Sequence, residues 1–195
     1  MTKHDLDSIE RTAQGVLREA GALTVPTNLD RVLASLAVHV HEEDMEPDVS
    51  GVLIIKGEQR HILLNKTHGE SRKRFTIAHE LGHLMLHDDG GKANANDERM
   101  FIDRQIRVYQ RTDSVANSPS KQEDSLTTPE QETEANAFAA ALLMPSHQVV
   151  RASLERDLFD EISVAALAKS FGVSEQAMSI RLLQLRLVTP NVGTV

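Results

Sequence analysis

A chain of 195 residues has the length of one domain, or of a compact domain with a small appendage. Its formal net charge of −8 argues against a protein that binds nucleic acid through bulk electrostatics, because neutralising phosphates requires clustered Lys and Arg. The absence of cysteine excludes a disulfide framework, a thiolate nucleophile and a cysteine-ligated zinc site, so any metal must be held by His and carboxylate side chains.

The N-terminal part of the chain predicts two helices and a short strand. Its first residues contain no apolar stretch long enough for a signal peptide or a membrane span, which favours a soluble cytoplasmic protein. Apolar residues three and four apart over residues 5–20 predict an amphipathic helix. Thr27 or Asn28 can cap a second helix that runs to Leu36. The alternation at residues 37–41 predicts a strand.

The clearest β pattern follows this strand. The segments GVLIIKG (51–57) and RHILLNK (60–66) flank the turn-like residues Gly57, Glu58 and Gln59. Two apolar runs joined by such a turn predict a hairpin, and with it a small antiparallel sheet. The second of these strands could bind an extended substrate by adding it as a further strand.

Helical patterns dominate the next hundred residues. The apolar spacing from Ser71 predicts a helix that ends at Asp88, just before a pair of glycines. Residues 112–129 are rich in Ser, Thr, Asp and Pro and predict a surface loop. A second, strongly helical segment covers residues 130–144 and is stopped by Pro145.

A metal-binding pattern lies in the first of these two helices. The run from His79 through Glu80 to His83 has the form H-E-x-x-H, and positions i and i+4 share one helix face, so both imidazoles can reach one ion. Zinc accepts neutral imidazole nitrogen as a ligand. Glu80 can take a proton from the attacking water and so act as the general base. The neighbouring residues are apolar, and a buried helix rarely carries two His and a Glu without a use for them.

Two His leave a catalytic zinc one protein ligand short. His87 lies one further turn along the helix, about 6 Å up its axis, so it is expected to support a ligand or to be exposed near the helix end. Glu132 and Asn136 share a face of the second helix, so Glu132 could bind zinc while the Asn136 oxygen steadies the N–H of a ligand His. Glu134 points to the opposite side and is the competing ligand. The remaining alternative is that these acidic residues form a solvated first turn.

Two segments of the chain resemble a known family. They are RFTIAHELGHLMLH (74–87) and ETEANAFAAALLMP (132–145), and together they are far more specific than H-E-x-x-H alone. They resemble the ImmA/IrrE-type metallopeptidases of bacteria and their mobile elements. The preceding hairpin is similar to the strand region of that family, so the resemblance covers roughly residues 25–150. The long polar insert at 89–129 departs from the family pattern.

The resemblance implies a fold, a metal and a substrate. The implied fold is α+β, a zincin-like, gluzincin-like metallopeptidase domain that contains the H-E-x-x-H helix. The implied site is Zn²⁺ bound by His79, His83 and Glu132, with Glu80 as the base. Family members typically act inside the cell by cleaving a helix-turn-helix repressor.

The C-terminal residues 151–195 are expected to form a helical appendage to a metallopeptidase domain at residues 1–150. The segment VAALAKSFGVSEQAMSIRLLQ (164–184) fits a helix-turn-helix pattern, with Gly172 at the turn. The side chains that its second helix would offer to DNA are Gln176, Ser179, Arg181 and Gln184. Acidic residues match the basic ones in this segment, which favours packing or partner docking over DNA binding.

Two functions remain open at this point. The first is a zinc-dependent endopeptidase that hydrolyses a peptide bond in a regulatory protein, with a helix-turn-helix repressor as the expected substrate. The second is a zinc-stabilised binding module whose C-terminal helices bind DNA or a repressor without proteolysis. Glu80 favours the first, because a structural metal site needs no general base. Tyr109 and His147 are candidate hydrogen-bond donors to the reaction's oxyanion.

Overall fold

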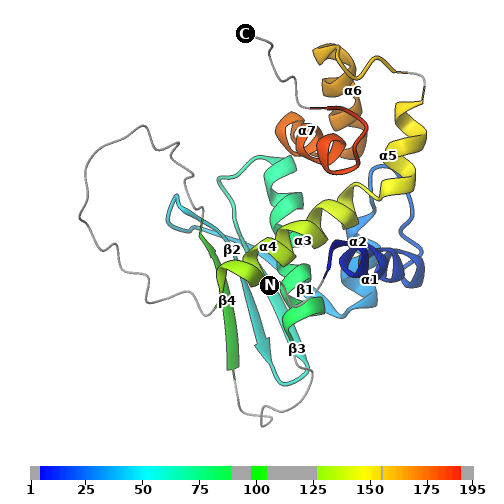
Figure 1. The fold of residues 1–195 in the computed structure, drawn as a ribbon. Coiled ribbons are helices and arrows are strands. Elements are labelled where there is room, and N and C mark those ends of the chain that lie inside the picture. Colours follow the sequence, from blue (N-terminus) through cyan, green and yellow to red (C-terminus); the bar gives the residue numbers. More distant parts are fainter. Residues whose placement is uncertain (1–4, 89–97, 105–126, 155, 190–195) are drawn as a thin grey trace.

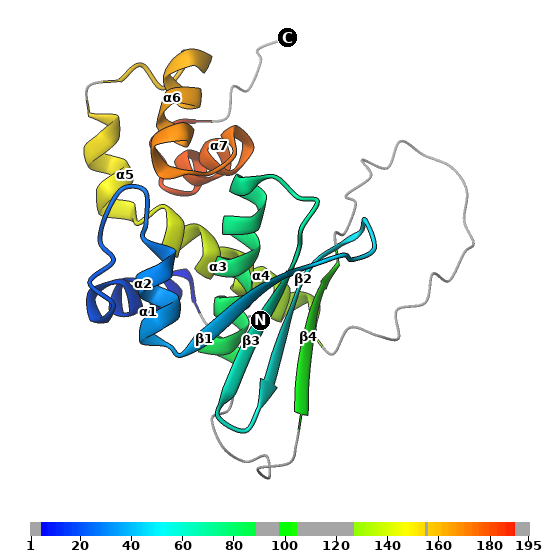
Figure 2. The same cartoon turned by 180° about the vertical axis from the view of Figure 1, so that it is seen from behind.

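The computed structural model describes residues 5–88, 98–104, 127–154 and 156–189. Within these ranges the chain forms a four-stranded sheet with helices packed against one of its faces (Figure 1). Figure 2 shows the sheet in front of α3 (Glu70–His87), which lies against the strands. The mixed α+β architecture is therefore confirmed. No helix in the described ranges is long and apolar enough to cross a membrane.

The two N-terminal helices lie close to their predicted positions. Helix α1 (Leu6–Glu19) begins after Asp5, whose carboxylate accepts a hydrogen bond from the backbone N–H of the first turn. Helix α2 (Leu29–Ser35) is capped by Asn28, whose side-chain oxygen accepts from a backbone N–H at 3.1 Å. Thr27 is not the cap, because its hydroxyl donates to the carbonyl of Leu142 at 2.9 Å.

The sheet is mixed, and the prediction of an antiparallel sheet was wrong for one of its strand pairs. Strands β2 (Val49–Lys56) and β3 (Gln59–Asn65) form the predicted antiparallel hairpin. Strand β1 (Val38–Glu43) pairs in parallel with β3. The strand order is β1-β3-β2-β4, so the hairpin places β3 between β1 and β2. Local turn residues identify the hairpin, but they do not determine which strand of it meets β1.

Strand β4 (Glu98–Arg104) was not predicted, because it lies within the polar insert. It pairs antiparallel with β2 and forms one edge of the sheet. Strand β3 is an interior strand that pairs on both sides, so its backbone cannot accept a substrate strand. The prediction of substrate binding along β3 was therefore wrong.

The inner face of the sheet carries the apolar core that positions α3. Buried apolar residues of the strands on this face are Val38, Leu53, Ile55, Ile62, Leu64 and Phe101. Gly51 of β2 allows α3 to lie directly on the sheet, since a Cβ at Gly51 would overlap the Thr76 methyl group and stand 3.2 Å from the Leu63 carbonyl oxygen. Side-chain size at this one strand position therefore limits how near α3 approaches.

Helix α4 (Pro129–Leu143) begins one residue earlier than predicted, because Thr128 caps it in a reciprocal arrangement with Gln131.

Helix α4 packs on α3 at a second glycine, Gly82 of α3. A Cβ on Gly82 of α3 would stand 2.9 Å from the Cα and 3.0 Å from the carbonyl oxygen of Ala135. Both neighbours are backbone atoms, so α3 and α4 can lie this close together only because Gly82 has no side chain.

This close approach gives a test of stability. Gly82→Ala should lower the free energy of unfolding by about 1–3 kcal/mol, because the added methyl group forces α4 away from α3. Gly15→Ala in α1 is the matched control, since its Cβ meets nothing within 4 Å, and it should raise stability by at most about 1 kcal/mol through helix propensity. Urea denaturation measures both, and a rise in the midpoint of both variants would contradict the contact.

Polar contacts connect the C-terminal helices to this core. They are α5 (Ser146–Ser153), α6 (Glu161–Phe171) and α7 (Glu175–Gln184). Gly172 ends α6 in a left-handed conformation with φ of 67°, which favours glycine, and Ser174 caps α7. Arg74 of α3 donates to the Gly172 carbonyl at 3.2 Å. The division of the chain at residue 150 stays a prediction.

Candidate metal centre

His79 and His83 stand one turn apart on the buried face of α3. Their exposed fractions are 2% and 1%, and their Nε2 atoms lie 3.0 Å apart. The Phe101 ring of β4 stacks on the His83 ring with centroids 5.3 Å apart. The i, i+4 spacing therefore produces the shared direction that the sequence predicted, and β4 restricts the motion of one ring.

Glu132 reaches the same two nitrogen atoms from the first turn of α4. Its Oε2 lies 3.2 Å from His79 Nε2, and its Oε1 lies 3.4 Å from His83 Nε2. One ligand atom from each of the three residues lies within 4.8 Å of the others. Two imidazole nitrogens and one carboxylate match the donor set of a catalytic zinc site, so the residues present fit this metal.

The protonation state of Glu132 also suits a ligand. Burial raises the pKa of Glu132, but hydrogen bonds with His79, His83 and Thr127 outweigh this effect and place that pKa well below its ordinary range. The carboxylate is consequently ionised at neutral pH, the form in which it binds a cation.

Asn136 determines which nitrogen of His79 is available to an ion. The Oδ1 atom of Asn136 lies 3.0 Å from His79 Nδ1. An amide oxygen only accepts hydrogen bonds, so His79 Nδ1 carries the proton and Nε2 keeps its lone pair. Asn136 and Glu132 therefore act from one helix face on opposite sides of the same ring.

A second chain of contacts supports His83. Its Nδ1 lies 3.1 Å from His87 Nδ1, and His87 Nε2 lies 3.0 Å from Glu134 Oε2. If His83 binds an ion through Nε2, its Nδ1–H must donate to His87 Nδ1, and His87 Nε2–H then donates to Glu134. His87 is 9% exposed, so the alternative that it is exposed near the helix end was wrong.

The helical spacing predicted that Glu134 points away from α3, and this prediction was wrong. It is 2% exposed and contacts His87, whereas Glu132 is the more accessible carboxylate. At about 100° per residue, the two acids flank the buried stripe of α4 from its two sides. That stripe is formed by Ala135, Phe138, Ala139 and Leu142. Because α4 packs so closely on α3, both carboxylates reach it at different heights.

Glu80 lies between the two His residues in α3 and is fully buried. A Cβ on Gly51 would stand 3.4 Å from Glu80 Oε1, so the small strand residue leaves space for this carboxylate between helix and sheet. Tyr109 lies outside the described residues. His147 is exposed on α5.

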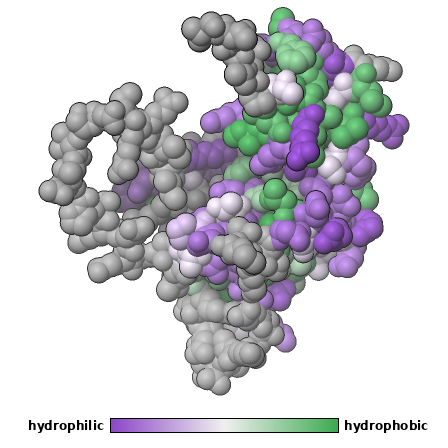
Figure 3. Space-filling model, viewed as in Figure 1, coloured by the Kyte–Doolittle hydropathy of each residue, from purple (hydrophilic) through white to green (hydrophobic). Residues whose placement is uncertain are grey.

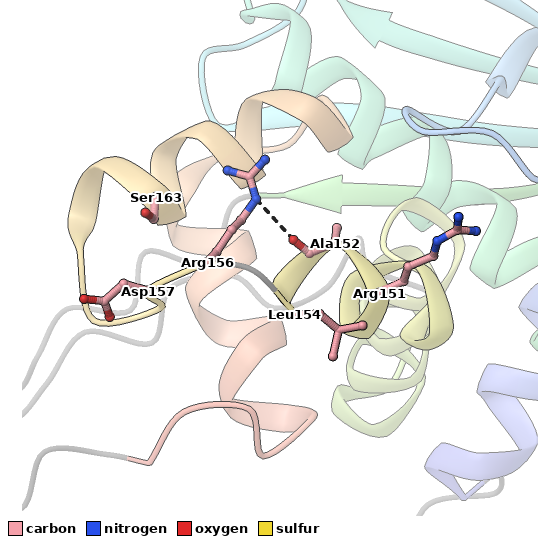
Figure 4. A pocket seen from close by; sticks show the side chains of 6 residues that line it. All are labelled: Arg151, Ala152, Leu154, Arg156, Asp157 and Ser163. Atoms are coloured by element: carbon pink, nitrogen blue, oxygen red, sulfur yellow. Dashed lines mark hydrogen bonds between the residues drawn. The ribbon is translucent and has the colours of Figure 1, made fainter.

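A cavity of about 620 Å³ lies away from these residues, between α5 and α6 (Figure 4). Two arginines line it, and Arg156 Nε donates to the Ala152 carbonyl at 3.1 Å within it. None of its lining residues belongs to the His-Glu cluster. The donor set rather than the size of a cavity therefore locates the candidate site.

The surface of the C-terminal helices does not favour DNA binding. Arg181 is 6% exposed and is paired with Glu10 of α1 at 2.6 Å, so it is not available to a phosphate or a base. Figure 3 shows apolar side chains gathered over α6 and α7. The exposed ones in and near these helices are Phe159, Ile162, Ile180 and Leu183. Sequence reasoning placed Arg181 on the recognition surface because the partner Glu10 is distant in the chain.

Phe101 was also missed by sequence reasoning. The only signal for it is the short apolar run of Met100, Phe101 and Ile102 inside the polar insert. This run is too short to distinguish a strand from a loop, and the partner strand β2 ends more than forty residues earlier.

One comparison with known proteins identifies the chain. A peptidase-family model described as the IrrE N-terminal-like domain matches residues 33–183. This range runs from α2 into α7 and contains both α3 and α4. No curated protein matches the chain. Since the family model covers most of the sequence and the cluster offers a possible metal site, the chain belongs to the ImmA/IrrE-type metallopeptidase family.

Proposed function

We propose that this protein is a zinc-dependent endopeptidase that cleaves a regulatory protein. The observation that supports this most directly is the convergence of His79, His83 and Glu132 within 4.8 Å in a chain of a peptidase family. A bound Zn²⁺ would supply Lewis acidity, which activates water near neutral pH and polarises a carbonyl group.

The chain's own residues provide orientation and proton transfer. Asn136 and the pair His87–Glu134 hold the two ligand imidazoles in the tautomer that leaves each Nε2 free of a proton. Glu80 accepts the proton of the attacking water and then passes it to the leaving amine. Its burial keeps the carboxylate out of bulk water, which strengthens its interaction with a positive charge.

The edge of the sheet formed by β4 is the proposed place for the substrate backbone. In the described residues β4 pairs on one side only, with β2, and its Phe101 contacts the ligand His83. An extended peptide could add to β4 as a further strand and so pass beside the metal centre. We infer from the family resemblance that the substrate is a helix-turn-helix repressor.

Co-expression tests this function directly. The protein is produced together with the product of the neighbouring gene, and cleavage is followed by mass spectrometry. We expect cleavage that a chelator stops and added Zn²⁺ restores. A substrate that is cut equally well in the presence of chelator would show that another protease is responsible.

Metal content is the second measurement. Purified protein should contain about one zinc per chain, and His79→Ala or His83→Ala should lose most of it, because two protein ligands rarely hold a catalytic zinc. His147→Ala, at an exposed position of α5, is the control and should retain the metal. An unchanged zinc content in both ligand variants would exclude this site.

A further inference from the structure

Three histidines gather on the outer face of the sheet, opposite the metal centre. In the parallel pair β1–β3, His39 lies directly beside His61, and His41 follows two residues later on the same face of β1. Among the described elements, helices cover only the inner face of the sheet (Figure 2). The strand register and the exposure of these histidines place their side chains on the other face. His39 and His41 are exposed, and His61 is partly exposed.

The rings of these histidines are close together. His41 Nε2 lies 3.1 Å from His61 Nδ1, and the two ring centroids are 5.3 Å apart. The centroid of the His39 ring lies 5.5 Å from that of the His61 ring. The strand register produces this grouping, since neighbouring strands lie about 4.8 Å apart and residues i and i+2 share a face.

The spacing of the two nitrogen atoms suits a metal ion. Two ligands of one tetrahedral ion, with bonds of about 2.0–2.1 Å, stand about 3.3–3.4 Å apart. Without an ion, one of the two rings must instead donate a hydrogen bond to the other. Only His41 and His61 place nitrogen atoms at this spacing, and a third nitrogen would require the exposed His39 side chain to rotate toward them.

The geometry points to a second metal site, formed by His39, His41 and His61, that takes a divalent transition ion such as Zn²⁺, Ni²⁺ or Cu²⁺. Imidazole suits these ions, whereas Mg²⁺ and Ca²⁺ prefer oxygen ligands. The formal net charge of −8 does not oppose uptake of a cation. An ion held by both strands would connect the edge strand β1 to β3 and stabilise the folded chain.

The two sites differ in accessibility, which allows them to be separated. His79 and His83 are almost completely buried, whereas His39 and His41 face solvent. Calorimetric titration of the zinc-loaded, full-length protein with further Zn²⁺ therefore measures the outer site alone. We expect a second binding event in the micromolar range. His41→Asn and His61→Asn should each weaken it by at least about tenfold, the loss seen even for residues that only support metal ligands.

His147→Asn is the matched control, because His147 is exposed on α5 outside the cluster, and it should leave the second event unchanged. Retention of the untagged protein on immobilised Ni²⁺ gives a second measurement, since a resin-bound ion cannot reach the buried centre. Absence of a second event in the wild type would overturn the proposal. So would a second event that persists unchanged in both His41→Asn and His61→Asn.

Discussion

Replacing Glu80 by Gln should leave the zinc content unchanged and lower the rate of peptide hydrolysis by about 10²–10⁴-fold, the usual contribution of a positioned general base. Glutamine preserves the size of the side chain but cannot accept the proton of the attacking water. Because Glu80 does not belong to the cluster of His79, His83 and Glu132, its replacement should not release the metal.

The measurement requires a verified substrate and a matched variant. Glu130→Gln removes an exposed carboxylate from the first turn of α4 and should cleave at the wild-type rate. Turnover is followed together with zinc content, so a loss of metal is distinguished from a loss of chemistry. Wild-type turnover by zinc-loaded Glu80→Gln would show that a different group is the base.

Removing either carboxylate of α4 should weaken zinc binding, but to different extents. Glu132→Ala deletes the third ligand and should abolish stable binding, since only two His then remain. Glu134→Ala removes the acceptor of His87, which in turn contacts His83, and should reduce affinity by about 10–100-fold. Competition with a chromophoric chelator measures both affinities.

A third variant separates charge from hydrogen bonding at Glu134. Glu134→Gln keeps an oxygen that can accept from His87, so its zinc affinity should lie between those of the wild type and Glu134→Ala. Equal affinities of Glu134→Ala and the wild type would show that the contact with His87 does not support the ligand. A larger loss in Glu134→Ala than in Glu132→Ala would reverse the assignment of the third ligand.

The sequence was most informative where a pattern is local. Helix α3 and the hairpin of β2 and β3 follow from the spacing of apolar residues and from one turn, because both are determined by neighbours in the chain. The i, i+4 rule also placed His79 and His83 on one face of that helix. Family membership could be inferred from the same local motifs, and the family model confirms it.

Helical spacing was a less reliable guide to which residues of α4 face α3. From the spacing alone, only one of Glu132 and Glu134 was expected to reach α3, because the two residues lie about 200° apart around the helix. In the structure the buried stripe lies between them, and both reach α3. The absence of a side chain at Gly82 brings the helices close enough for this, and a contact between two distant segments has no local signature.

The sequence by itself determined the chemistry that is available: two His and a Glu on one helix, acidic ligand candidates on another, and no cysteine. Only the tertiary structure decided how these groups combine. It placed β3 inside the sheet and β4 at its edge, paired Arg181 with Glu10, and connected His83 through His87 to Glu134. Each of these contacts joins residues from separate elements, and the packing of a shared core, rather than the spacing of nearby residues, brings them together.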